Sequence, residues 1–161
     1  MKTRNVRVQT RDDWRLVADD APVDVSRAVL LSLERWNREV DAGEIDLRRV
    51  GLRLETDDNV EALSGPFPNV RIIDLHFADF TDGRHYSNAR LLRQRFGYQG
   101  ELRASGDVTR DQVLYLARCG FNAFEMADDS QLEEALASLD DFSEYYQASA
   151  DQALPLYRRR G

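Results

Sequence analysis

Short apolar runs typical of buried strands alternate along this chain with runs of helical periodicity. The strand-like runs are Ala28–Leu33, Val50–Leu54, Val70–Phe77, Glu101–Ser105 and Asn122–Met126. Alternation of this kind predicts an α/β domain with a mainly parallel sheet, because parallel neighbours need a crossover connection that is usually a helix. Right-handed crossovers place the helices on the outside of the sheet. An open sheet and a partial barrel both fit the pattern.

The two ends of the chain differ from this alternation. Val6–Val8 and Trp14–Val17 are short extended runs around a polar link, and they predict a small N-terminal β-hairpin. Residues 144–161 contain tyrosines, Pro155 and three terminal arginines, and we expect a loosely ordered C-terminal tail. The predicted organisation is therefore one α/β domain over residues 1–143, followed by that tail.

Two helix starts match the capping-box pattern, in which Ser or Thr is followed three residues later by Gln or Glu. They are Thr109–Gln112 and Ser130–Glu133. The helix after the second box is expected to turn four apolar side chains inward: Leu132, Leu136, Leu139 and Phe142.

Composition excludes several classes of protein. The net charge of -7 argues against nucleic-acid binding, which needs a concentrated basic face. No apolar run approaches the roughly 18 residues of a membrane helix, and the N-terminal segment lacks the apolar core of a signal peptide. The one cysteine, Cys119, cannot form an internal disulfide, and its place before Gly120 at a helix end favours a buried core residue over a thiolate nucleophile. We expect a cytoplasmic protein with no nucleic-acid or membrane partner.

Polar residues gather where strands give way to helices. Helix N-termini offer free N–H groups, and Arg84 and Arg110 could add bidentate contacts, so neighbouring helix starts could bind an oxyanion. The alternative is that Asp82 and Asp107 are ordinary cap residues that repel an anion. The candidate anion-binding residues are Gly83, Arg84, Ser87, Ser105, Gly106, Asp107 and Arg110.

His76 and Glu125 are the candidates for acid–base chemistry, against the alternative of plain hydrogen-bonding roles. The spacing of His76 and His85 fits no compact ligand motif, so no metal site is expected. Neither GxGxxG nor GxxxxGK[ST] occurs, and one cysteine cannot hold an iron–sulfur cluster. We therefore expect no resident cofactor.

The segment Phe80–Met126 carries a distinctive combination of motifs: FTDGR, YS-ARLLR, GY-GELRA-GDV-RDQ and ARCGF-AFE. With these motifs the chain resembles a bacterial family known as domain of unknown function 934. The segments Trp14–Asp20 and Leu139–Gln147 resemble it as well. The resemblance implies an association with assimilatory sulfite reduction, where members are described as oxidoreductases or accessory proteins. It implies no catalytic residues.

Three hypotheses follow. The first is an accessory protein or subunit of assimilatory sulfite reduction, without its own redox cofactor and bound to sulfite reductase or another sulfur-assimilation enzyme. The second is a small enzyme that binds an oxyanion or a phosphorylated ligand at the carboxyl ends of the strands. The third is a homo-oligomeric scaffold that associates through the helix at Val113–Ala117. We favour the first; whether the protein is itself an enzyme stays open.

Overall fold

Seven parallel strands form one curved sheet in the computed structural model, which describes residues 7–9, 13–24, 26–43, 46, 48–63 and 69–140. The strand order is β1-β7-β6-β5-β4-β3-β2. The strands are β1 (Arg7–Gln9), β2 (Arg15–Leu16), β3 (Val29–Leu31), β4 (Val50–Leu54), β5 (Ile72–Phe77), β6 (Glu101–Gly106) and β7 (Ala123–Glu125). All described pairings are parallel, which confirms the predicted α/β class.

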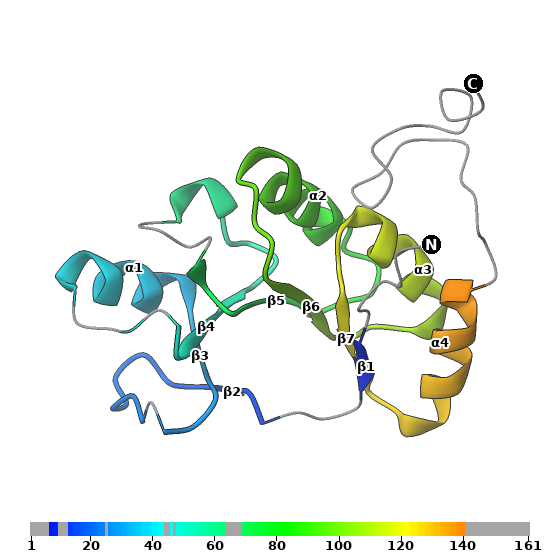
Figure 1. The fold of residues 1–161 in the computed structure, drawn as a ribbon, viewed down its shortest axis with the longest axis horizontal. Coiled ribbons are helices and arrows are strands. Elements are labelled where there is room, and N and C mark those ends of the chain that lie inside the picture. The colour runs from blue at the N-terminus through cyan, green and yellow to red at the C-terminus, as the bar shows by residue number, and fades with distance from the viewer. Residues whose placement is uncertain are drawn as a thin grey trace.

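Helices connect these strands. The α-helices are α1 (Leu33–Ala42), α2 (Arg84–Arg90), α3 (Arg110–Cys119) and α4 (Leu132–Asp140). Shorter helical turns are Val60–Ala62, Leu91–Arg95 and Asp129–Gln131, of which Leu91–Arg95 is a π-helical continuation of α2. Figure 1 shows α1, α2 and α3 along one side of the sheet, while α4 packs beside α3 and contacts β1. No helix in the described part of the chain has the length and apolarity needed to cross a bilayer.

The predicted N-terminal hairpin is wrong. β1 pairs with β7 and β2 pairs with β3, so these consecutive strands lie at opposite edges of the sheet. Two short extended runs specify strands but not partners, because strand pairing depends on the rest of the chain.

The short segment between β1 and β2, which lie at opposite edges, requires the sheet to curve. Gln9 and Arg15 are six residues apart, so their Cα atoms lie within about 22 Å of each other. The edges of a flat seven-stranded sheet would be about 29 Å apart. The sheet is therefore an open half-barrel, with a helix-covered outer face and an inner face.

The outer face carries the hydrophobic core. Successive side chains of a strand point to opposite faces, so every second residue of β4, β5 and β6 lies under the helices. These buried residues are Val50, Leu52, Leu54, Ile73, Leu75, Phe77, Leu102 and Ala104. Helix α3 adds Leu116 and the buried Cys119, which confirms that cysteine as a core residue. The capping box between Thr109 and Gln112 is also present.

The start of α4 differs from the prediction. Asp128 accepts a hydrogen bond from the backbone N–H of Ser130 at 2.9 Å, and Ser130 belongs to a 3-10 turn that precedes the helix. The inward residues of α4 are Leu132, Ala135 and Leu139, whereas Leu136 is 45% exposed. Phe142 and the predicted tail at 144–161 lie outside the described residues.

Candidate ligand site on the inner face of the sheet

Polar side chains take the place of the core on the inner face of the same strands. Asp74 lies between Arg53 of β4 and Arg103 of β6 in the strand register. The next inward position pairs His76 with Ser105. Because inward residues recur every second position, these side chains form two adjacent rows across the sheet near the carboxyl ends of its strands.

The row formed by Arg53, Asp74 and Arg103 contains a buried ion pair. Arg103 Nε donates to Asp74 Oδ1 at 2.7 Å, and Arg103 Nη1 lies 3.0 Å from Glu125 Oε2. Asp74 is 0% exposed and Arg103 is 2% exposed. Ser105 Oγ donates to the second oxygen of Asp74 at 2.9 Å. Burial of such a pair is costly unless its hydrogen bonds are satisfied, and here both oxygens of Asp74 have a donor.

His76 lies beside Ser105 in the second row. Its side chain is half-buried, and its Nδ1 is 3.3 Å from Ser105 Oγ. Burial lowers the pKa of His76, and the positive charges of Arg53 and Arg103 act in the same direction against the opposing Glu55 and Asp74. The imidazole is therefore neutral at neutral pH.

Gly106 gives the His76 ring its room. Its φ of 84° lies in the left-handed region that favours glycine. A Cβ atom at this position would lie 2.2 Å from the carbonyl oxygen of Phe77 and 2.7 Å from His76 Cε1. A larger residue would displace both the strand end and the imidazole.

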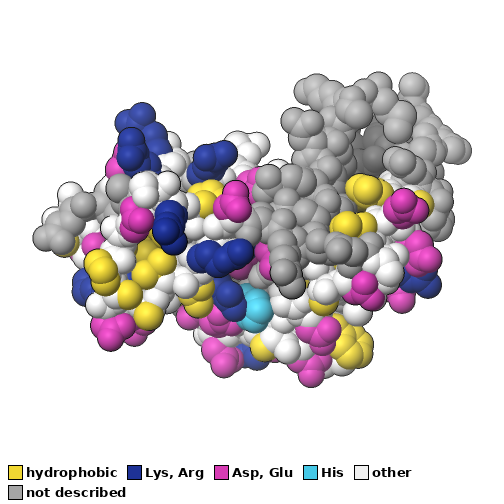
Figure 2. Space-filling view, turned by 90° about the horizontal axis from the view of Figure 1, so that it is seen from below, with side chains coloured by type: hydrophobic (Ala, Val, Ile, Leu, Met, Phe, Trp, Pro, Cys, Tyr) yellow, Lys and Arg dark blue, Asp and Glu magenta, His cyan; other side chains and the backbone are white. Residues whose placement is uncertain are grey.

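These side chains line a cavity of about 360 Å³. Its wall carries Arg15, Arg53, Arg103, His76 and one carboxylate, Glu125. The remaining lining residues are Trp14, Leu16, Leu30, Ser105, Gly106, Met126 and Ala127. Figure 2 looks onto this face and shows a histidine beside basic side chains, with acidic side chains around them.

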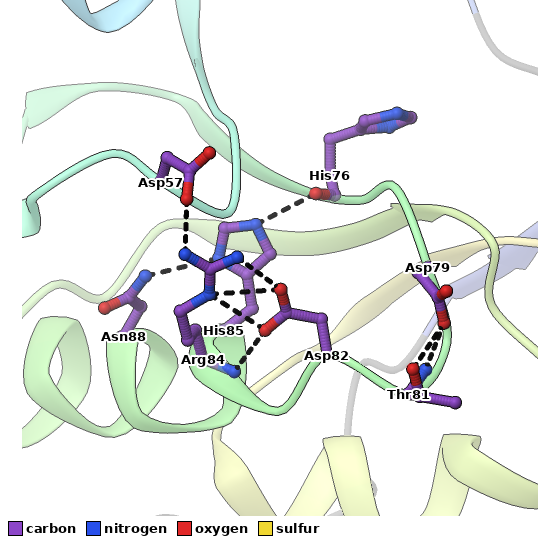
Figure 3. A network of polar contacts seen from close by, with 8 residues as sticks. All are labelled: Asp57, His76, Asp79, Thr81, Asp82, Arg84, His85 and Asn88. Atoms are coloured by element: carbon purple, nitrogen blue, oxygen red, sulfur yellow. Dashed lines mark hydrogen bonds and ion pairs between the residues drawn. The ribbon is translucent and has the colours of Figure 1, made fainter.

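His85, the second histidine, lies on the other side of β5 and has a different environment. Its Nε2 donates to the main-chain oxygen of His76 at 2.9 Å, and Asn88 Nδ2 lies 3.3 Å from its Nδ1 (Figure 3). It is 0% exposed, and burial lowers its pKa. His85 is a neutral structural residue that ties α2 to β5, while the ring of His76 points away from it.

The structure divides the predicted site residues into two groups. Ser105, Gly106, His76 and Glu125 line the inner cavity together. The other predicted residues lie at the helix starts and do not line it: Gly83, Arg84, Ser87, Asp107 and Arg110.

The helix-start residues already have protein partners. Arg84 forms ion pairs with Asp82 and Asp57, as Figure 3 shows. These pairs raise the pKa of Arg84 and lower that of Asp82 to about 2. Arg110 pairs with Glu134 of α4, and Asp107 accepts from the backbone of Phe80 at 3.1 Å. Gly83 is the N-cap residue of α2, and Ser87 lies within that helix. Anion binding at these helix starts stays a prediction.

Sequence reasoning missed Asp74, Arg53 and Arg103 as site residues. A signal was present, because Asp74 lies in a mostly apolar strand and shares a face with His76 two residues later. Arg103 and Ser105 repeat this spacing on the next strand. Such alternation indicates that one face of a parallel sheet is not covered by helices.

The cavity wall is suited to a small anion. An arginine has five N–H donors and no acceptor, and the pair with Glu55 uses only Nε of Arg53, at 2.8 Å. Among the described residues, no group of three or more His, Cys, Asp or Glu side chains is arranged to hold a metal ion.

The protein is thus a parallel half-barrel with a polar cavity on its inner face. The sequence model of one family, described as bacterial protein of unknown function (DUF934), matches residues 51–157. The chain belongs to that family. No curated protein matches it.

Proposed function

We propose that this protein binds a small oxyanion in the inner cavity and acts as an accessory protein of assimilatory sulfite reduction. The observation that carries the binding proposal is the charge of the cavity wall. In a chain of net charge -7, the wall presents three arginines and one carboxylate. Asp74 lies beneath Arg103 and Ser105, and Glu55 is not part of the wall, so an entering ligand meets cationic donors first.

The role in sulfur metabolism is supported by the family resemblance and by the size of the cavity, which accommodates sulfite. The proposed role includes a cytoplasmic location and association with sulfite reductase or another sulfur-assimilation enzyme. Copurification with sulfite reductase from cell extract tests this association. Growth of a deletion strain on sulfate as sole sulfur source, unchanged from that of the parent, would contradict it.

Calorimetric titration of the full chain with sulfite and with inorganic phosphate tests the binding site. Arg53→Gln should weaken binding by about tenfold to a hundredfold, because it removes a charged donor from the wall. This variant leaves no buried charge unpaired, since Arg53 is half-buried and its partner Glu55 is accessible.

Arg84→Gln is the matched control, because Arg84 lies outside the cavity and pairs with Asp57 and Asp82. It should bind with unchanged affinity. Loss of binding in Arg84→Gln, with full retention in Arg53→Gln, would show that the anion binds at the helix starts and not in the inner cavity. No binding of either anion would overturn the proposal.

A small enzyme acting on a phosphorylated ligand is the second candidate for the same cavity. It is supported by His76, a titratable imidazole that faces a cavity with basic side chains. Release of phosphate from a panel of phosphorylated metabolites, abolished by His76→Asn, would favour the enzyme.

A further inference from the structure

We propose that the cavity selects an oxyanion that keeps a proton, such as hydrogen phosphate or hydrogen sulfite, over fully ionised sulfate, because His76 Nε2 accepts a hydrogen bond from that proton. The inference rests on the proposed oxyanion site and names its ligand class. It follows from the direction of each hydrogen bond between Asp74 and His76.

The direction is set at Asp74. Its Oδ1 accepts from Arg103 and its Oδ2 lies 2.9 Å from Ser105 Oγ, so the carboxylate takes the hydroxyl proton of Ser105. A serine hydroxyl has one proton to donate, and towards His76 it therefore acts as an acceptor. His76 Nδ1, at 3.3 Å, then carries the imidazole proton. In the neutral ring this leaves Nε2 as an acceptor.

The ring is held so that Nε2 is the atom available to a ligand. The glycine at position 106 lies against the Cε1 and Nδ1 edge of the ring. His76 lines the cavity with Arg53 and Arg103, and within the described part of the chain Nε2 has no hydrogen-bond partner. An anion held by the arginines would thus place one of its oxygens against an acceptor. A protonated oxygen of the anion donates a hydrogen bond to Nε2. An oxygen without a proton is repelled, because both atoms are then acceptors.

The charged groups that face His76 maintain this state at neutral pH. They come from five strands or strand ends: Arg15, Arg53, Glu55, Asp74, Arg103 and Glu125. Burial disfavours the imidazolium ion, and the nearest arginines add to that effect. In acid the ring gains a proton at Nε2 and becomes a donor, so the preference for the protonated oxyanion should narrow as pH falls.

The test compares inorganic phosphate with sulfate, which resemble each other in shape, by calorimetry on the full chain at neutral pH. The wild-type protein should bind phosphate at least about tenfold more tightly, the effect of one hydrogen bond together with the acceptor pair that sulfate would create. His76→Asn keeps a donor near Ser105 but removes the Nε2 acceptor. It should lose most of this discrimination through weaker phosphate binding, and circular dichroism checks its fold.

The ring tautomer gives a readout that needs no ligand and no variant. Nitrogen NMR of the wild-type imidazoles should show His76 protonated at Nδ1 and His85 at Nε2. A His76 protonated at Nε2 would overturn the inference, as would discrimination retained in a folded His76→Asn. Equal binding of phosphate and sulfate would overturn it while leaving the proposed oxyanion site intact. Binding of neither anion would overturn both.

Discussion

The six residues of strand β5 alternate between two faces of the sheet that differ in polarity. On the outer face Ile73, Leu75 and Phe77 pack under the helices, and all three are buried apolar residues. On the inner face Asp74 and His76 join a polar network that borders a cavity. The comparison shows that one strand can supply both the stability of the fold and its candidate site, because alternation assigns each residue to one face.

The two histidines illustrate the same division. His85 uses both ring nitrogens in contacts within the protein and is fully buried. His76 uses one, and its ring faces the cavity. The face on which a histidine lies therefore distinguishes a structural residue from a candidate ligand-binding residue better than its type does.

Substitution of a core residue on the outer face should change stability most. Leu75→Ala should lower the free energy of unfolding by about 4 kcal/mol, because it removes a 0% exposed side chain from a close-packed core. Urea unfolding followed by circular dichroism measures this. Binding of phosphate by the folded fraction should be unchanged. A loss below about 1 kcal/mol would show that Leu75 is not part of the principal core.

The buried ion pair should come next. Asp74→Ala should cost about 3 kcal/mol, because it removes the carboxylate that lies 2.7 Å from Nε of the buried Arg103. The double variant Asp74→Leu/Arg103→Leu should recover much of this stability, since apolar groups can replace a buried ion pair. It should not recover anion binding. Recovery of binding in the double variant would contradict the role of the inner face.

The pH dependence should be smaller and should arise from both faces. Burial lowers the pKa of His76 and His85 from 6.5, so above that pH both are neutral in the folded and unfolded chains and contribute nothing. Below about pH 6.5 the unfolded chain binds protons first, and stability falls until the folded histidines titrate. Chemical unfolding across this range should show a shallower fall in His85→Gln.

The histidine window is separate from that of the carboxylates. The pKa of Asp82 is lowered to about 2 from 3.8, so its contribution is present above pH 3.8 and is lost only as pH falls towards 2. A stability curve that is flat between pH 6.5 and 4.5 in the wild-type protein would contradict the neutral burial of the histidines.

The smallest effect is expected at the helix start of α2. Arg84→Gln should leave the melting temperature nearly unchanged, because Arg84 and Asp57 are exposed to solvent and Asp82 is only partly buried. Differential scanning calorimetry checks this. A large drop would mean that the loop between β5 and α2 depends on this arginine for its conformation.

Local patterns in the sequence predicted most of the fold. The strand runs, the capping box at Thr109 and the buried Cys119 depend on neighbours within a few positions, and the structure has them all. Strand partners are different, because the pairing of β1 with β7 joins residues more than a hundred positions apart. The two short N-terminal runs carried no information about that pairing.

The candidate site was predicted in part for the same reason. His76, Ser105, Gly106 and Glu125 could be placed at strand ends from the sequence, but their common cavity depends on the curvature of the sheet. The partners of Asp74 are 29 and 31 positions away. An acidic residue within an apolar strand signals a buried partner without saying which one. Arg84, which the sequence made prominent, proved to be paired with nearby acids.

One titration tests directly whether the inner cavity is the ligand site. The ring signals of both histidines are followed by NMR while inorganic phosphate or sulfite is added to the full chain. The signals of His76 should move and saturate, while those of His85, on the other face of the sheet, should stay in place. Saturable binding of the anion with His76 unmoved would contradict it.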